Sequence, residues 1–274
     1  MGIFRLAPLV VAALAASGCF QSSTLIRVNA DGSGTLEQTT LITQAGLQTL
    51  RQVWAMSADN GTKPVELFSA AQARQFAEGM GPGVTLVSST PIKNAEGEGS
   101  RAVLAFKDIS QLQAKHAQHA EADALGAERV VPQVHFAVTR DADGHALLHI
   151  TLPPAAAPAT KATAPEGSGA KPQTRMPPEQ LAMVRRLFAG SRVVVAVEPA
   201  GELVKTTCPF VDGNQVTLVD VAFDQVLTNE MAFVRLQSAR TVEEARAAVK
   251  GVPGLKVDLD PEITIEFAPN RSRP

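Results

Sequence analysis

Alternating apolar and polar residues predict antiparallel β-hairpins along the first half of the chain. The predicted strands lie at residues 24–29, 36–42, 84–88, 101–107, 134–139 and 146–152. Glycines in the turns Asp31–Gly34 and Asp141–Gly144 supply the positive φ that a tight turn requires. This half of the chain is therefore expected to be rich in hairpins.

The pattern of apolar residues and turns in the second half of the chain predicts a β-meander followed by one more strand. Its strands lie at residues 192–198, 202–207, 215–222 and 262–267. The uncharged run Val193–Val197 is typical of a central strand that is covered on both faces. Because the turn Pro199–Gly201 is short, we expect the first two of these strands to be neighbours in one sheet.

Apolar residues at helical spacing predict helices between the strands. These helices cover residues 45–57, 69–79 and 177–188, a short segment capped by Asp224, and a segment that begins at Thr241. Ser69 with Gln72, and Thr241 with Glu244, have the spacing of a capping box. We therefore predict an α+β fold in which antiparallel hairpins and a meander pack with several helices.

The first 18 residues have the pattern of a secretion signal. The apolar run Leu6–Ala16 follows Arg5, ends in small residues, and is shorter than the roughly 20 residues that span a bilayer. Ala16-Ser17-Gly18-Cys19 resembles the lipobox of bacterial lipoprotein precursors, although Leu is more common at the position of Ala16. The remainder of the chain shows no resemblance that we recognise.

The lipobox resemblance implies that Cys19 is lipidated and that the chain is cleaved after Gly18. The protein would then be held on the cell membrane or the outer membrane, at its periplasmic or extracellular face. Because no Asp follows Cys19, the resemblance favours sorting to the outer membrane. The alternative is ordinary cleavage at an A-x-A-like site, which would leave Cys19 as a free thiol.

Residues 153–176, rich in Pro, Ala, Thr and Gly, separate an α+β region at 19–152 from another at 177–268. This stretch cannot bury enough apolar surface to order itself, so we predict an extended insert or linker. We favour an insert within one domain, because the strands of the second region need a partner sheet; two domains are the alternative. The charged tail 269–274 is predicted to be disordered.

Composition argues against several classes of ligand. Removing 18 of 274 residues leaves 256, and the loss of Arg5 leaves 24 of the 25 basic side chains against 27 acidic ones. The resulting charge of −3 provides no electrostatic footprint for nucleic acid. Eleven Phe, one Trp and no Tyr argue against a sugar-stacking platform. With Cys19 lipidated, Cys208 cannot form a disulfide within the chain, and we expect a buried, inert thiol.

The hairpin at 134–152 places two histidines on its polar face. If Phe136 and Ile150 face one core, a register that matches both faces sets His135 opposite His149, close enough to share a metal ion or a proton. Ordinary solvent-facing polar residues are the competing and more common explanation. A second cluster, at 116–123 (HAQHAEAD), has two histidines on one helical face but no further ligand at a recognised spacing, and a solvated helix or loop is favoured there.

No catalytic motif appears in the sequence. A nucleophile with its base, a pair of carboxylates or a dinucleotide fingerprint would be expected at diagnostic spacings. We therefore expect a non-enzymatic protein without a cofactor: an envelope lipoprotein that binds the membrane through its lipid and serves as a binding or interaction module. A carrier of a lipid or other apolar ligand, with a cavity lined by Leu, Val and Phe, is one alternative, and a metal-binding envelope protein is another.

Overall fold

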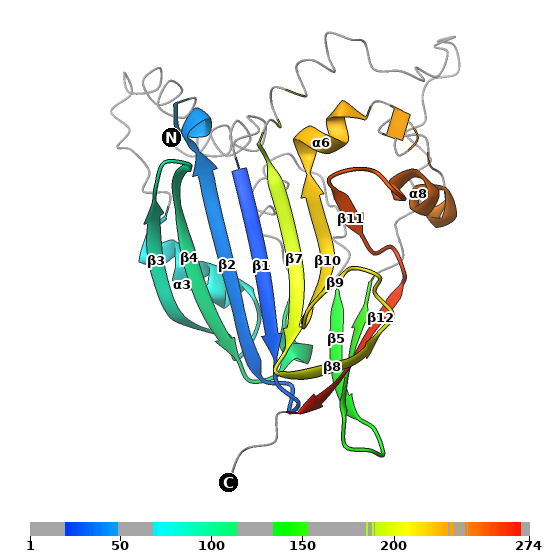
Figure 1. Cartoon of the computed structure of the whole chain (residues 1–274). Coiled ribbons are helices and arrows are strands. Elements are labelled where there is room, and N and C mark those ends of the chain that lie inside the picture. Colours follow the sequence, from blue (N-terminus) through cyan, green and yellow to red (C-terminus); the bar gives the residue numbers. More distant parts are fainter. Residues whose placement is uncertain are drawn as a thin grey trace, which may run out of the picture.

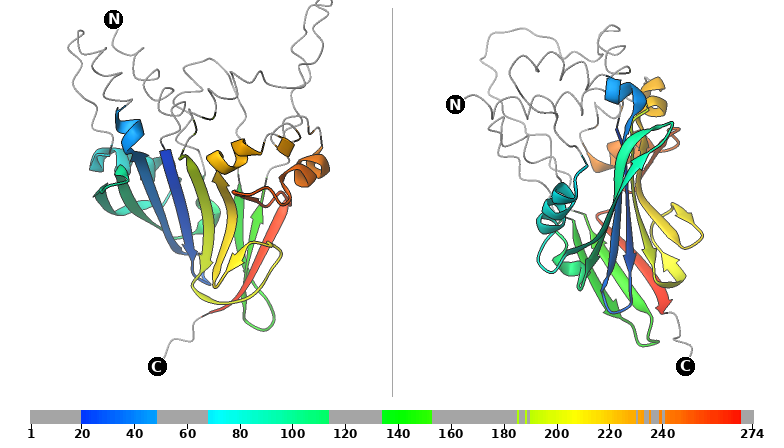
Figure 2. Two further views of the ribbon diagram at one scale, coloured as in Figure 1. Left: turned by 45° about the horizontal axis from the view of Figure 1, so that its top comes forward. Right: turned by 90° about the vertical axis from the view of Figure 1, so that its left-hand side faces the viewer.

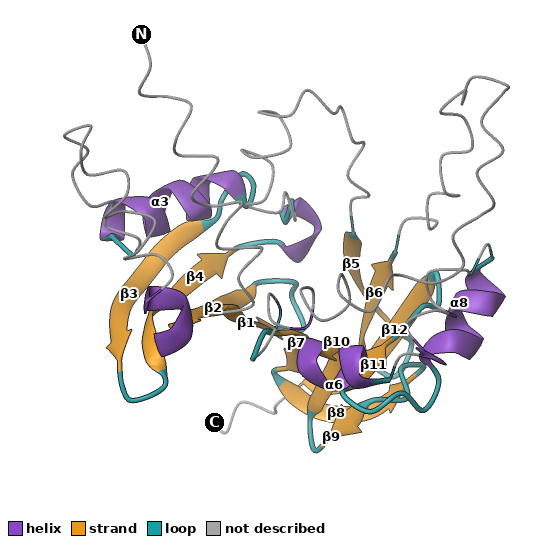
Figure 3. Cartoon of the chain, turned by 90° about the horizontal axis from the view of Figure 1, so that it is seen from above, coloured by secondary structure: helices purple, strands orange, loops and turns teal. Residues whose placement is uncertain are grey.

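The computed structural model describes residues 20–48, 68–113, 134–152, 190–229 and 241–269, with single positions at 185, 188, 231, 232, 235 and 239. Two β-sheets make up most of this part of the chain, and they share one hydrophobic core (Figure 1). The helix at residues 70–79 packs against the larger sheet and adds Ala77 to the core, whereas the helices at 223–228 and 242–249 lie near one end of the sheets (Figures 1 and 3). The expected α+β class is thus seen in a form dominated by sheet.

The larger sheet is built around β1. Its strand order is β11 (Leu255–Val257), β10 (Gln215–Ala222), β7 (Arg192–Pro199), β1 (Phe20–Val28), β2 (Gly34–Thr43), β4 (Gly97–Phe106) and β3 (Thr85–Lys93), and β9 (Val211–Asp212) also pairs with β10. β1 runs parallel to β7, whereas the other neighbouring strands of this sheet run antiparallel. The hairpin β1–β2 was predicted from alternation, and β3 and β4 were predicted as two strands joined by a polar loop. Both β3 and β4 are longer than expected.

The smaller sheet is antiparallel, in the order β5 (His135–Arg140), β6 (Ala146–Thr151), β12 (Glu262–Pro269) and β8 (Gly201–Thr206). Its inner face packs on the half of the larger sheet that includes Val28 and Leu36. The fully buried side chains are Phe267, Leu36, Leu104, Ile109, Leu148, Ile150, Ile263, Ile265, Val28, Val197 and Val216. Strands from before and after residues 153–176 therefore contribute to both sheets and to one core.

The path of β8 contradicts the predicted meander. β7 pairs directly with β10, while β8 leaves the larger sheet and pairs with β12. The Asn214 side chain holds this crossing, because its Nδ2 donates to the carbonyls of Pro199 and Gly201 at 2.8 and 2.7 Å. Its Oδ1 accepts the Leu203 amide at 2.8 Å. One amide side chain thus provides the hydrogen bonds that a neighbouring strand would otherwise make.

The helices only partly match the expectation of several packed helices. α3 (Ala70–Gly79) lies beside β3 and has the predicted capping box at Ser69 (Figure 3). The described residues also include a 3-10 turn η3 (Ile109–Gln111), α6 (Phe223–Thr228) and α8 (Val242–Val249), whose N-cap is Thr241 as predicted.

Two predicted helices lie mostly outside the described residues, and a third has a different N-cap from the predicted one. Residues 44–48 are helical, but the rest of the predicted helix at 45–57 lies outside the described residues, as does nearly all of that at 177–188. The prediction that Asp224 caps α6 is wrong. Ala222 occupies the N-cap without a side-chain bond, and Asp224 lies in the first turn. There its charge favours the helix through the macrodipole rather than by capping.

The two ends of the larger sheet differ. β1 begins at the end that also carries α6, whereas β12 ends near the opposite end, where the β5–β6 turn projects (Figures 1 and 2). Among the described helices, none has the length and apolar character to cross a bilayer.

Candidate functional site

The predicted lipidation site lies next to a central strand. Cys19 is outside the described residues, but β1 begins at the next residue, Phe20. Phe20 pairs with Ile42 of β2, and Gln21 pairs with Leu41 on one side and with Arg192 of β7 on the other. The fold therefore starts one residue after the predicted acceptor of the lipid.

Two histidine–carboxylate pairs lie on the outer face of the smaller sheet. His145 Nδ1 lies 2.9 Å from Glu266 Oε1, and His149 Nδ1 lies 3.0 Å from Glu262 Oε1. Both pairs connect the segment that contains β6 to β12. The two histidines are four residues apart in the sequence, and so are the two glutamates. The alternation of Ile263 with polar neighbours on β12 buries the isoleucine and turns both glutamates outward.

The β5–β6 turn adds a third ligand-type side chain to one of these pairs. Asp141 Oδ1 accepts the backbone amides of Asp143 and His145 at 2.9 and 2.8 Å. Its other carboxylate oxygen, Oδ2, lies 3.6 Å from His145 Nδ1. The hydrogen bond to Glu266, with the charges of Asp141, Glu266 and Asp143, raises the pKa of His145 above its ordinary value, against a smaller opposing effect of desolvation.

Asp141, His145 and Glu266 form the cluster that could hold a metal ion. One ligand atom from each lies within 4.8 Å of the other two. Zn²⁺ takes imidazole nitrogen and carboxylate oxygen at about 2.0–2.2 Å, so small side-chain rotations would bring the three atoms to coordination distance. Three protein ligands leave a fourth position for water or an external group.

The prediction that His135 lies directly opposite His149 is wrong, because β5 and β6 pair in a different register. His135 pairs with Thr151, and His149 pairs with Ala137, so the two histidines are diagonal neighbours rather than opposite residues. The predicted faces are preserved because the offset is two residues and side chains alternate with period two. Diagonal Cβ atoms lie about 7–8 Å apart, so a shared ion at His135 and His149 stays a prediction that needs side-chain movement.

The cluster at Asp141, His145 and Glu266 was missed from the sequence. The sequence does contain a matching pattern: His145 and His149 are four residues apart, as are Glu262 and Glu266. The two segments become neighbours only in the folded protein, so the pattern alone does not show that they meet. The other candidate, at residues 116–123, lies outside the described part of the chain.

Cys208 is buried, as expected, with 3% of its surface exposed. Its Sγ donates to the Thr217 carbonyl at 3.4 Å, and burial raises the pKa of the thiol to about 11. The Asp258 carboxylate nearby contributes to the same shift. Only a minute fraction of this cysteine is thiolate near pH 7, so it is suited to packing rather than to nucleophilic chemistry.

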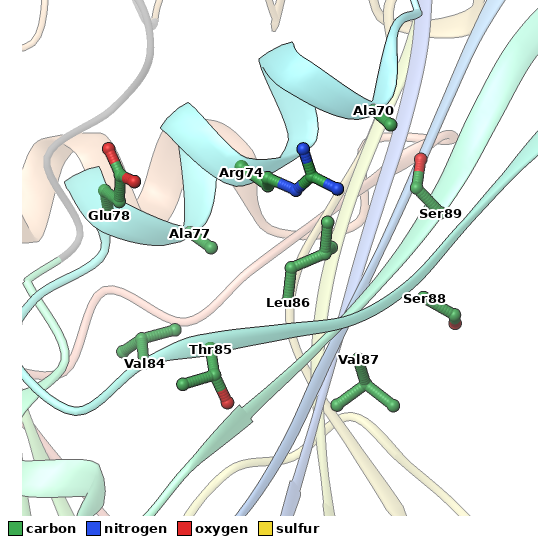
Figure 4. A pocket seen from close by; sticks show the side chains of 10 residues that line it. All are labelled: Ala70, Arg74, Ala77, Glu78, Val84, Thr85, Leu86, Val87, Ser88 and Ser89. Atoms are coloured by element: carbon green, nitrogen blue, oxygen red, sulfur yellow. The ribbon is translucent and has the colours of Figure 1, made fainter.

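A groove of about 520 Å³ separates α3 from β3. Figure 4 shows Arg74 and Ala77 of α3 on one side and Leu86 of β3 on the other. Ser88 and Ser89 also line it, so the lining is mixed. Val84, Leu86 and Val87 supply part of the Leu, Val and Phe lining expected of a carrier of apolar ligands, and the carrier alternative stays a prediction.

Comparison with known proteins assigns no family. No family model matches the chain, and no curated protein matches it significantly. Among solved structures, it is similar to the folded domain of the Mycobacterium tuberculosis protein LppM, determined by NMR, with 13% sequence identity. That match covers 73% of this chain and 81% of the other, at a TM-score of 0.29, which is too low to carry an argument about fold or function.

Proposed function

We propose that this protein is an envelope lipoprotein, anchored through Cys19, whose folded part acts as a non-enzymatic binding module at the membrane surface. The observation that carries the proposal is the lipobox-like sequence Ala16–Cys19, after which β1 starts at once. A cleavage after Gly18 would retain every described strand, because β1 begins at Phe20.

Lipidation of one cysteine is energetically sufficient to hold the protein on a bilayer. Each buried methylene contributes about 0.8 kcal/mol, and two or more acyl chains convert reversible binding into stable anchoring. The residue after Cys19 is Phe20 rather than Asp, which supports the outer membrane as the destination. The module then acts in the periplasm or outside the cell.

Metabolic labelling with radioactive palmitate tests the anchor. The full chain expressed in a bacterium with two membranes should incorporate label and sediment with membranes, and the Cys19→Ser variant should do neither. Cys208→Ser is the matched control, because it removes the other cysteine while leaving the lipobox intact. Labelling that persists in Cys19→Ser, or that disappears in Cys208→Ser, would contradict the proposal.

A second candidate function is binding of a divalent metal ion, supported by the grouping of Asp141, His145 and Glu266. Titration of the metal-free protein with Zn²⁺, followed by calorimetry, tests it. His145→Gln and Glu266→Gln should each weaken binding at least tenfold, since each removes one of three ligands.

A matched control separates this cluster from the pair suggested by the sequence. The double variant His135→Gln/His149→Gln leaves the cluster intact and should keep the affinity of the wild type. Loss of binding only in the double variant would assign the ion to His135 and His149 instead. An absence of binding in the wild type would end both metal hypotheses.

A further inference from the structure

We infer that the protein stands on the bilayer by one end of its larger sheet, the end at which β1 begins, and points the Asp141–His145 turn away from the lipid. This inference rests on the proposed lipidation of Cys19. The partner surface is the headgroup layer of the membrane that holds the anchor.

The tether between the proposed lipid on Cys19 and the fold is one residue step long. Consecutive Cα atoms are 3.8 Å apart across a trans peptide, so the lipid-bearing residue lies one such step from Phe20. Phe20 is already paired with Ile42, and Gln21 is held from both sides by β2 and β7. No linker separates the anchor from the sheet, so this end cannot move far from the bilayer.

Several other segments of the fold gather at the end where β1 begins. Antiparallel pairing places the end of β2 and the β3–β4 turn beside the start of β1, and parallel pairing places the start of β7 there. The helix α6 lies at the same end (Figure 1). Phe20 and Met231 are exposed apolar residues, with 38% and 65% of their surfaces accessible. Met231 follows α6 closely, and the Ala232 amide donates to Asn229 Oδ1 at the end of that helix.

Lys93 completes a surface suited to lipid headgroups. Its side chain is 80% exposed at the end of β3, and it pairs with Glu98 at 3.1 Å. A lysine stem can lie along apolar surface while its ammonium group reaches phosphate oxygens. The same hairpin also carries Glu96 and Glu98, and exposed apolar side chains occur elsewhere at Val204 and Val211. The short tether therefore sets the orientation, and the exposed apolar side chains and the lysine stem at this end are compatible with a headgroup layer.

The opposite end of the larger sheet lies far from the anchor. β1 has nine residues at about 3.3 Å each, which places the far end of the sheet roughly 25–30 Å from its start. The turns there carry charges of both signs, Asp31, Asp141 and Asp143 together with Lys107 and Arg140, so distance from the anchor rather than net charge keeps this end away from the bilayer. The histidine–carboxylate cluster at the β5–β6 turn is thus placed where a soluble ion or envelope partner can reach it.

Quenching of a fluorophore by lipid-attached nitroxide tests this orientation. Ala95, in the β3–β4 turn, and Ala142, in the β5–β6 turn, are both exposed alanines at hairpin tips, so Ala95→Cys and Ala142→Cys form a matched pair. Each lipidated full-length variant is labelled with a thiol-reactive fluorophore and reconstituted into anionic phosphatidylglycerol/phosphatidylcholine vesicles with nitroxide on the headgroup. The unsubstituted protein gives the background from buried Cys208.

The label at residue 95 should be quenched at least threefold more than that at residue 142. Inserting about 12 Gly and Ser residues between Cys19 and Phe20 gives a flexible tether of about 19 Å and should abolish most of the difference. Equal or reversed quenching in lipidated, vesicle-bound protein would overturn the orientation while leaving the anchor intact. Failure of palmitate labelling to depend on Cys19 would overturn the anchor itself.

Discussion

Phe267 provides the sharpest test of the shared core. Its side chain is completely buried on β12, between β6 and β8, and pairs with Ala146 and Leu203. The ring also lies against the start of β8, because a Cβ added at Gly201 would lie 3.3 Å from Phe267 Cδ2. The residue therefore contacts segments from both sides of residues 153–176.

Phe267→Ala should lower the free energy of unfolding by about 3–5 kcal/mol, the usual cost of truncating a buried aromatic side chain. That is a large part of the 5–15 kcal/mol that stabilises a typical domain. With a urea m-value of about 3 kcal/mol/M, the midpoint should fall by about 1 to 1.7 M. Circular dichroism of residues 20–274, secreted without the lipid, measures it.

Phe20→Ala is the matched control, because this phenylalanine is partly exposed at the end of β1. Its loss should cost less than that of Phe267, about 1–2 kcal/mol, since 38% of its surface stays in water in the folded protein. A decrease below 1 kcal/mol in Phe267→Ala would refute the packing argument. A second transition, in which one half of the protein stays folded, would refute the shared core.

Three further predictions concern an ion pair, a thiol and a helix cap. Arg101 and Arg27 donate to Glu37 and lower its carboxyl pKa. Glu37→Gln should therefore cost about 1 kcal/mol at pH 7. The stability gained from a lowered pKa is present above the ordinary value of 4.5 and lost as pH falls through the lowered one. Urea midpoints measured down to pH 3 should thus converge, and a constant difference would contradict this cause. Cys208 should react with a thiol reagent only when urea unfolds the protein; rapid reaction in native buffer would contradict its burial. Ser69→Ala should cost about 0.5–2 kcal/mol and speed amide exchange in α3, with Ser69→Thr restoring protection; unchanged exchange would argue against the cap.

Local pattern predicted the local parts of the fold well. Alternation around glycine-containing turns gave β1–β2 and β5–β6, and the capping boxes gave the starts of α3 and α8. Each of these elements depends on residues a few positions apart. The uncharged Val193–Val197 likewise indicated a central strand, and β7 lies between β1 and β10.

Errors arose where distant contacts decide the outcome. A hairpin register can slip by two residues without moving any side chain to the other face, so alternation could not fix the pairing of His135. The Asp141 carboxylate fixes it instead, by accepting two amides within the turn. β8 was assigned to a meander because nothing local shows that Asn214 would bond to both sides of the crossing.

The candidate site illustrates the same limit. His145 and Glu266 are 121 positions apart in sequence, and only the pairing of β6 with β12 brings them together. The proposed lipidation site, in contrast, rests on four consecutive residues, Ala16–Cys19, and stays a prediction. Recognition of such a motif would need an extended chain and no tertiary contact.

The position of β1 also has a mechanical consequence. With the proposed lipid on Cys19, an acyl chain that resists extraction would pull on Phe20 along the axis of the strand. Along its length β1 is hydrogen bonded to β2 on one side and to β7 on the other. Such a pull loads these bonds together in shear, because inter-strand hydrogen bonds run across the strand direction, rather than opening them one at a time. Force on the anchor is thus distributed over the larger sheet, and the lipid should leave the bilayer before the strand leaves the sheet.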